Sequence, residues 1–303
     1  MFGPAERIET RVFARLPETL RIKGRKSAWA FGKGSDNLHS FLEGPCFDRA
    51  GNLFVTDIPY GRILRVTPDG TWSVVTEYDG WPNGLAIHRD GRIFIADHKR
   101  GIMVLDVASG RVDPVLEGVR REGFKGTNDL TFARNGDLYF TDQGQTGLQD
   151  PSGRVFRLRH DGNVDCLLDK VPSPNGLVLS KDEKTLFLAV TRANQVWRVP
   201  LHGDGTTSKV GAFINMSGGS GPDGMALADD GSLVVAHVGL GSVWIFDRLG
   251  EPRARLMSCA DLSTTNVAFG GAAGKTLFIT ESDSGTILSA DVAVAGHTLY
   301  SHA

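Results

Sequence analysis

Six polar residues that could bind a metal ion recur along the chain at nearly regular intervals. They follow one another after 40, 45, 47, 48 and 43 residues, and they are Glu43, Asn83, Asn128, Asn175, Asp223 and Asn266. All six side chains offer oxygen as a ligand atom, which suits a hard divalent cation such as Ca²⁺, Mg²⁺ or Mn²⁺. None is a His or Cys, so the set is less suited to a dedicated zinc site.

Each of these residues stands at, or just before, a copy of one pattern: a short apolar strand, a turn and a more hydrophobic strand. The third copy, NDLTFARNGDLYFTD at Asn128–Asp142, is typical, and the pattern indicates a β-hairpin. A repeat of about 40–45 residues with several short strands is typical of a β-propeller blade. The sequence therefore predicts an all-β, six-bladed β-propeller, one domain over residues 1–303, with the six residues in an axial metal-binding ring.

Three of the ring positions lie in similar triplets, Pro82-Asn83-Gly84, Pro174-Asn175-Gly176 and Pro222-Asp223-Gly224. Asn-Gly and Asp-Gly are common turn dipeptides, and a preceding proline would only sharpen the turn. Three such triplets in register, with Glu43 in the same slot, favour a binding ring over three ordinary turns.

The second strands of the copies end in a further polar set: Asp57, Asp97, Asp142, Thr191, His237 and Glu281. Because a hairpin returns to the face from which it starts, we expect these residues on the same rim as the ring. Asp142 and His237 are candidates for substrate contact, and His98 or His237 could act as a base. The insertion Gln143–Gly153 is a candidate lid or specificity loop.

Residues 1–42 precede the first copy and do not match the repeat. Thr10–Leu16 alternates like a strand, and we expect it to pair with the last blade, because an unclosed ring leaves two sheet edges unpaired. The alternative is a loose N-terminal arm. Ser27–Leu42 is expected to be a loop across one face, and Thr298–Tyr300 a short final strand.

The composition excludes several classes of partner. The 303-residue chain has a formal net charge of −2 and shows no basic stripe and no 18-residue apolar run, so neither nucleic acid nor a membrane is expected. Its N-terminus is too charged for a secretory signal. Three separated cysteines, Cys46, Cys166 and Cys259, favour reduced, buried thiols in a cytoplasmic protein. The oligomeric state is left open.

Four motifs carry a resemblance to a known family. Leu42-Glu43-Gly44-Pro45, Thr127-Asn128-Asp129, Ser173-Pro174-Asn175-Gly176 and Gly221-Pro222-Asp223-Gly224 resemble the motifs of the senescence marker protein/gluconolactonase family, and the likeness spans about residues 40–292. The segments NDLTFARNGDLYFTD and GSVWIFDRLGEP are similar to the drug-responsive lactonases of that family. The resemblance implies a six-bladed propeller with lactonase activity.

The resemblance also implies roles for individual residues. Glu43, Asn175 and Asp223 would bind one divalent metal ion, with Asn128 completing the site, and Asp223 would also act as the general acid and base. Calcium is the first choice of ion, ahead of magnesium, manganese or zinc. The candidates for substrate binding are Asn83, Asn128, Asp142 and His237.

Two positions depart from the family pattern. The gluconolactonase branch usually has an arginine two residues before the third-blade asparagine, where this chain has Gly126, which argues against an aldonolactone substrate. The second calcium site of the drug-responsive branch is not expected, because the loop Arg120–Lys125 is basic.

The function predicted is that of a metal-dependent lactonase, a carboxylic ester hydrolase acting on a small-molecule lactone. The metal would polarise the carbonyl while Asp223 assists the attack of water. The alternatives are a paraoxonase-like esterase or strictosidine-synthase-like propeller and, from another class, a non-catalytic propeller that binds a partner on its rim. No Ser or Cys nucleophile with a paired base is visible, which disfavours acyl-enzyme chemistry.

Overall fold

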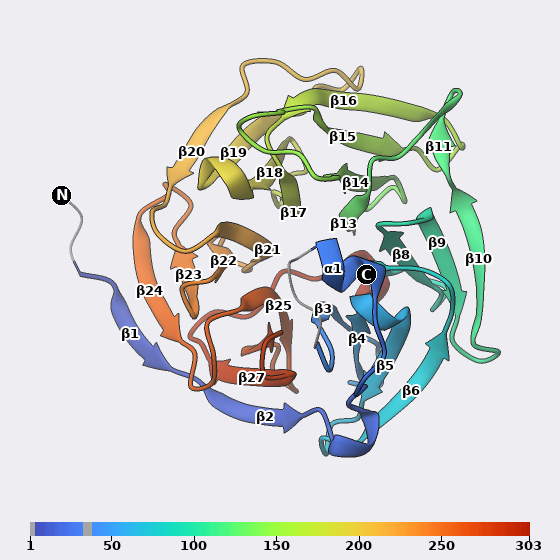
Figure 1. Ribbon diagram of the computed structural model, residues 1–303. Helices are drawn as coiled ribbons and strands as arrows, with labels where there is room; N and C mark the ends of the chain where they lie inside the picture. The colour runs from blue at the N-terminus through green and yellow to red at the C-terminus, as the bar shows by residue number, and fades with distance from the viewer. Residues whose placement is uncertain (1–3, 33–37) are drawn as a thin grey trace.

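Six antiparallel sheets stand around a central axis like the blades of a propeller in the computed structural model, which describes residues 4–32 and 38–303 (Figure 1). In each blade the first strand lies innermost and is hydrogen-bonded to the second, and the second to the third. The inner strands contact one another in sequence around the axis, and the last contacts the first. The all-β, six-bladed propeller predicted from the repeat is confirmed.

The blades follow the chain in order, and their strands have these bounds. Blade one is β3 (Leu42–Phe47), β4 (Leu53–Asp57), β5 (Arg62–Val66) and β6 (Trp72–Glu77); blade two is β7 (Pro82–Ile87), β8 (Ile93–Asp97), β9 (Gly101–Asp106) and β10 (Arg111–Leu116). Blade three is β13 (Thr127–Phe132), β14 (Leu138–Asp142), β15 (Gly153–Leu158) and β16 (Val164–Val171); blade four is β17 (Pro174–Leu179), β18 (Thr185–Val190), β19 (Gln195–Pro200) and β20 (Gly211–Asn215). Blade five is β21 (Gly221–Leu227), β22 (Leu233–Val238), β23 (Ser242–Phe246) and β24 (Pro252–Met257); blade six contains β25 (Thr264–Gly270), β26 (Thr276–Glu281) and β27 (Thr286–Asp291).

The N-terminal segment completes two neighbouring blades. Strand β2 (Arg11–Arg15) pairs antiparallel with β27 as the outer strand of blade six, as the alternation of Thr10–Leu16 predicts. Strand β1 (Glu6–Glu9), which the sequence pattern does not reveal, pairs parallel with β24 as a fifth strand of blade five. The N-terminal segment therefore supplies the outermost strand of both blade five and blade six.

The hydrophobic core lies between the faces of adjacent blades. The second strands of blades one and three, β4 and β14, are buried along their whole length because a blade packs on each side of them. One core cluster joins blades one and two through Phe54, Leu85 and Ile95, and another joins blades six and one through Leu16, Leu53 and Ile287. This two-sided burial explains why the second strand of each repeat is more hydrophobic than the first.

Short elements and loops lie over the two ends of the channel. The inner strands begin on the face that carries α1 (Ala28–Gly32) (Figure 1). The Trp29 ring lies 4.8 Å from that of Phe41. The expected loop Ser27–Leu42 therefore contains a short helix, and residues 33–37 lie outside the described part. The remaining short elements are the two-stranded ribbon β11 (Gly118–Val119) and β12 (Glu122–Gly123), and the 3-10 turns η1 (Glu18–Leu20), η2 (Ile58–Tyr60) and η3 (Thr191–Ala193).

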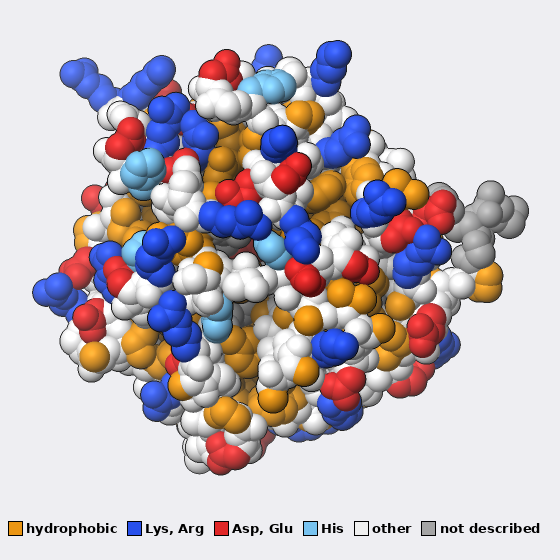
Figure 2. All heavy atoms as spheres, turned by 180° about the vertical axis from the view of Figure 1, so that it is seen from behind, with side chains coloured by type: hydrophobic (Ala, Val, Ile, Leu, Met, Phe, Trp, Pro, Cys, Tyr) orange, Lys and Arg blue, Asp and Glu red, His pale blue; other side chains and the backbone are white. Residues whose placement is uncertain are grey.

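The opposite face carries the hairpin turns and the C-terminal residues, and Figure 2 shows charged side chains of both signs scattered over apolar surface there. The expected strand Thr298–Tyr300 is wrong, because the chain forms a 3-10 turn, η4 (Tyr300–His302). The Tyr300 ring stacks 5.1 Å from that of Phe132, and Arg49 donates a hydrogen bond to the Ser301 carbonyl. The segment thus ties blades one and three together across the axis instead of extending a sheet.

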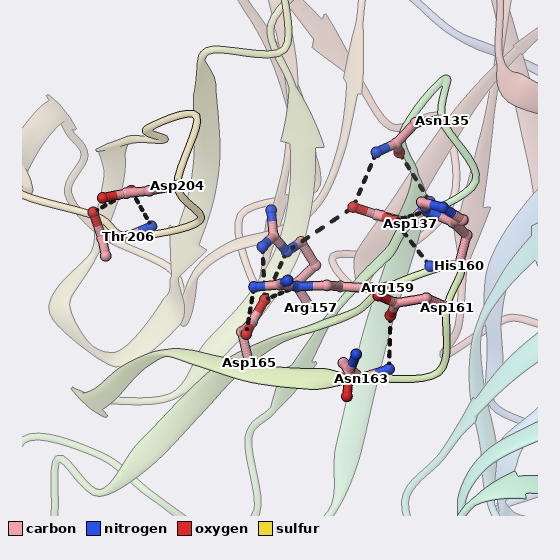
Figure 3. Close-up of polar contacts among 10 residues, drawn as sticks. All are labelled: Asn135, Asp137, Arg157, Arg159, His160, Asp161, Asn163, Asp165, Asp204 and Thr206. Atoms are coloured by element: carbon pink, nitrogen blue, oxygen red, sulfur yellow. Dashed lines mark hydrogen bonds and ion pairs between the residues drawn. The ribbon is translucent and has the colours of Figure 1, made fainter.

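Ion pairs stabilise the outer part of blade three (Figure 3). Asp165 accepts hydrogen bonds from both Arg157 and Arg159, at 2.7 Å from the closest nitrogen of each. Asp137, in the turn between β13 and β14, accepts from the backbone N–H of His160 at 2.9 Å. The Asp165 contacts hold the second hairpin together and the Asp137 contact joins it to the first, so the network has a structural explanation.

All three cysteines are unpaired, as predicted, but only Cys46 is buried; Cys166 and Cys259 are exposed. The expectation of three buried thiols is therefore wrong for two of them, which lie on or beside outer strands. Within residues 4–32 and 38–303 there is no helix of the length and hydrophobicity needed to span a bilayer.

Candidate active site

The six ring residues occupy equivalent places at the start of the inner strands. Each is between 4% and 9% exposed, and the set comprises Glu43, Asn83, Asn128, Asn175, Asp223 and Asn266. In every blade the pairing of the first two strands shifts register at, or immediately beside, the ring residue. Such β-bulges re-aim side chains, and they recur next to active sites.

The Pro-Asn-Gly triplets are not turns. Pro82-Asn83-Gly84 and Pro174-Asn175-Gly176 open the strands β7 and β17. A Cβ added to Gly176 would lie 2.4 Å from the Asp223 carbonyl oxygen, so the inner strands of blades four and five touch backbone to backbone. The glycine is required by this close approach, which packs adjacent ring residues around a narrow channel.

A hydrogen bond between two ring residues spans the junction at which the ring closes, between blades six and one. Asn266 of blade six donates a hydrogen bond from Nδ2 to Oε2 of Glu43 in blade one at 2.9 Å, and the Gly44 N–H donates to the same oxygen at 2.7 Å. The Asn266 Oδ1 accepts from the Val267 N–H at 2.8 Å. Asn266 therefore acts as a donor that holds Glu43.

Asp129 is a half-buried carboxyl at the axis that was not among the predicted site residues. Burial, together with the charge of Glu43, raises the pKa of Asp129 to about 8, although hydrogen bonds from the Leu130 N–H and Asn266 act in the opposite direction. The residue after the ring position is glycine or valine in the other five repeats. This single exception to the repeat was the signal that could have identified Asp129.

Asn128 is held by a chain of side-chain hydrogen bonds. Its Nδ2 donates to Oε1 of Gln143 at 3.0 Å, and Nε2 of Gln143 donates to Oγ of Ser173 in blade four at 3.0 Å. By contrast, the amides of Asn83 and Asn175 make no hydrogen bond with the described residues. Their oxygens remain available to a ligand.

The residues at the ends of the second strands lie on the predicted face but point into the blades. Asp142 is fully buried, accepts from the Gly126 N–H at 2.9 Å and pairs with Arg154 at 2.6 Å. Asp57 does the same with the Phe41 N–H and Arg62. These carboxylates fix the loops that lead into the inner strands, and the substrate contact proposed for Asp142 stays a prediction.

His237 is also buried within its blade, at 1% exposure. Its Nε2 lies 2.9 Å from the Gly218 carbonyl and must donate to it. Nδ1 has no partner among the described residues. His237 therefore supports the Gly218 loop, and its predicted contact with substrate stays a prediction.

His98 is half-buried beside the ring of Trp81, with 6.1 Å between the ring centroids. It fills the space beside Gly126, where a Cβ would come within 2.4 Å of the imidazole and φ is +146°. An arginine at position 126 does not fit this arrangement, so the departure from the gluconolactonase pattern has a steric basis.

A cavity of about 1080 Å³ lies on the hairpin-turn side of the ring. Asp129 and Asn266 line it near the axis, and Phe132, Phe269 and Tyr300 line it towards the C-terminal segment. The ring thus separates this cavity from the face that carries α1.

The donor chemistry at the axis fits a hard divalent cation. Glu43 and Asp223 supply carboxylates, and Asn128 and Asn175 supply amide oxygens, which are the ligands that Ca²⁺ and Mg²⁺ take in proteins. Among the described residues no three His, Cys, Asp or Glu side chains are grouped so as to hold a metal ion. A cation at the ring would therefore depend on the amide oxygens as well as the two acids.

Comparison with known proteins gives one consistent result. The sequence profile described as SMP-30/Gluconolactonase/LRE-like region matches residues 41–283. Over 228 residues the chain is 32% identical to Lactonase drp35 of Staphylococcus epidermidis, and over 229 residues it is 33% identical to Lactonase drp35 of Staphylococcus aureus; each alignment covers 71% of this chain and 69% of the relative.

Two solved structures share the fold over almost the whole chain. A calcium-binding protein, regucalcin, from Agrobacterium tumefaciens superposes with a TM-score of 0.78 at 21% identity, covering 99% of this chain and 100% of its own. A gluconolactonase from Xanthomonas campestris superposes with a TM-score of 0.74 at 24% identity, covering 98% and 99%.

Proposed function

Because this chain belongs to the SMP-30/gluconolactonase/LRE-like family, we propose that it is a metal-dependent lactonase. The observation that carries the proposal is the axial ring, in which the buried acids Glu43 and Asp223 and four amides occupy equivalent places on six inner strands. Relatives about one-third identical are named lactonases, and a structural neighbour is described as calcium-binding.

The metal ligands in this proposal are Glu43, Asn128, Asn175 and Asp223. A divalent cation bound there supplies Lewis-acid polarisation of the lactone carbonyl; calcium is the first candidate, because carboxylates and neutral amides together suit its flexible coordination. Asn266 keeps Glu43 in place by its 2.9 Å hydrogen bond. Asn83 and Asn128 bind the substrate through their amide groups.

Asp223 performs the proton transfers of the reaction. It accepts a proton from the water that adds to the lactone carbonyl carbon, and it returns a proton to the ring oxygen when the ester C–O bond breaks. The product is one open-chain hydroxy acid, whose carboxyl group then releases a proton to solvent to give the carboxylate. The buried surroundings of the ring exclude bulk water and strengthen the electrostatic interactions with the developing negative charge.

The test is a lactone panel assayed with a pH indicator, using protein stripped with a chelator and then reloaded with Ca²⁺. We expect hydrolysis only in the reloaded protein, and we expect Glu43→Ala to lose both the bound ion and activity. Glu6→Ala, on the exposed outer strand β1, is the control and should behave as wild type. Wild-type protein that binds no divalent ion, or that opens no lactone when loaded, would contradict the proposal.

A further inference from the structure

The seam between blades three and four is built differently from the other five. At those five seams a buried threonine hydroxyl on one blade donates to a backbone carbonyl on the adjacent blade, at 2.8 to 3.2 Å. These threonines are Thr56, Thr127, Thr191, Thr264 and Thr265. No such bond joins blades three and four in the described part of the chain.

A network of hydrogen bonds that involves three side chains joins blades three and four instead. Gln143 donates from Nε2 to Ser173 Oγ, the Ser173 N–H donates to Thr146 Oγ1 at 3.1 Å, and Thr146 Oγ1 donates to the Gln143 carbonyl at 2.6 Å. Thr146 and Ser173 are 8% and 3% exposed. Ser173 has a φ of +66°, a left-handed conformation that costs a serine free energy and persists only when its surroundings hold it. The position of Gln143 is thus fixed from two blades.

This hydrogen-bond network includes a ring residue. Gln143 Oε1 accepts the hydrogen bond from Nδ2 of Asn128 at 3.0 Å. An asparagine amide carries its donor and its acceptor on opposite sides. With Nδ2 turned to Gln143, Oδ1 is the atom that Asn128 presents to a ligand at the axis.

We infer that Gln143 is a positioning residue that holds the Asn128 amide with its oxygen directed to the axial ligand. The inference rests on the proposed function, since it assigns to Asn128 the role of an oxygen donor in the metal ring. Partners that orient metal ligands in this way usually change metal affinity 10- to 100-fold when they are removed. The insertion after β14 therefore contributes to the ring, in addition to any contact it makes with substrate.

The test compares Ca²⁺ binding, by isothermal titration calorimetry, among chelator-stripped variants. Gln143→Leu keeps the size of the side chain and removes both hydrogen bonds, and we expect its Kd for Ca²⁺ to rise about tenfold or more. In Gln143→Glu a carboxylate oxygen still accepts from Asn128, and the Ser173 hydroxyl can donate to the other oxygen. We expect this variant to bind Ca²⁺ within about threefold of wild type.

Gln195 supplies a matched control. It also makes two side-chain hydrogen bonds, donating to Asn215 Oδ1 and accepting from Trp197 Nε1, both at 2.8 Å, but it lies at the start of the third strand of blade four. We expect Gln195→Leu to bind Ca²⁺ as wild type does, and to match Gln143→Leu in the loss of melting temperature of the metal-free protein. This comparison separates an effect on the ring from a general loss of stability.

The outcomes distinguish the inference from the proposal on which it rests. If wild type binds Ca²⁺ and opens lactones while Gln143→Leu binds within twofold of wild type, the positioning role is wrong and the lactonase proposal stands. A Gln143→Glu variant that binds no better than Gln143→Leu also overturns the positioning role. If wild type binds no divalent ion, both fail.

Discussion

Asp223 has two proposed roles, as metal ligand and as base, and a single substitution separates them. Asp223→Asn keeps the shape and one oxygen ligand but removes the base. We expect the variant to bind Ca²⁺ more weakly and to lose at least about 10²-fold in kcat, the low end for general acid–base catalysis, even when saturated with Ca²⁺. Recovery of most of the rate at high Ca²⁺ concentration would leave Asp223 as a ligand only.

Because His237 is buried, we expect the free energy of unfolding to depend on pH. Burial of the His237 imidazole lowers its pKa from the ordinary value of 6.5. The hydrogen bond with the Gly218 carbonyl acts in the opposite direction, and the charge of Arg255 lowers the pKa by a smaller amount. A proton on Nδ1 would meet no acceptor among the described residues. As the pH falls below 6.5 the unfolded chain therefore gains a proton that the folded chain resists, and the free energy of unfolding decreases.

The measurement is urea unfolding of wild type and His237→Gln at pH 7.5 and 5.5. We expect wild type to lose more stability than the variant over this interval, because glutamine does not titrate. Equal losses would show that His237 titrates alike in both states. His237→Gln should retain lactonase activity, since the imidazole supports a loop; loss of activity in a folded, metal-loaded variant would favour a histidine base.

At the level of the strands, the glycine that follows four of the six ring residues sets the distance between inner strands. Gly176→Ala places a Cβ 2.4 Å from the Asp223 carbonyl oxygen, which is backbone and can move only with its strand. We expect a loss of about 1–3 kcal/mol in the free energy of unfolding, as for other overpacked sites, together with weaker Ca²⁺ binding, because the ring must widen.

Gly211→Ala is the matched control for this prediction. Gly211 also opens a strand, β20, and no atom lies within 4 Å of its ideal Cβ position. Chemical denaturation of the two variants tests the point. Equal stability of Gly176→Ala and Gly211→Ala would mean that the inner strands separate without cost.

The closure of the whole molecule depends on the junction between blades six and one. Leu16 is 2% exposed there and packs in one cluster with Leu53 of blade one and Ile287 of blade six. We expect Leu16→Ala to lower the free energy of unfolding by about 2–5 kcal/mol, the usual range for a buried leucine. Val12→Ala, at an exposed site on the neighbouring strand β2, should cost much less, and thermal unfolding compares the two.

The architecture and the positions of the ring residues could be predicted from the amino-acid pattern alone. A repeat of one hairpin every 40 to 48 residues has few folded solutions, and a polar residue in the same slot of each repeat must lie at the axis once the ring closes. The same reasoning identified the closing strand β2, because its alternation is local and visible.

Which polar side chains face the axis, and which instead hold the surrounding loops, depends on how the six blades pack together. Asp142 and His237 end their strands on the expected face, yet both are buried in their blades and hold loops. Asp129, in contrast, lies at the ring beside Glu43 and Asn266 of other blades. Gln143 contacts the ring residue Asn128 and is held in turn by Ser173 at blade four. Period and composition give the position of a side chain along a strand, but its direction depends on bulges and on backbones that meet only when the six blades have packed together.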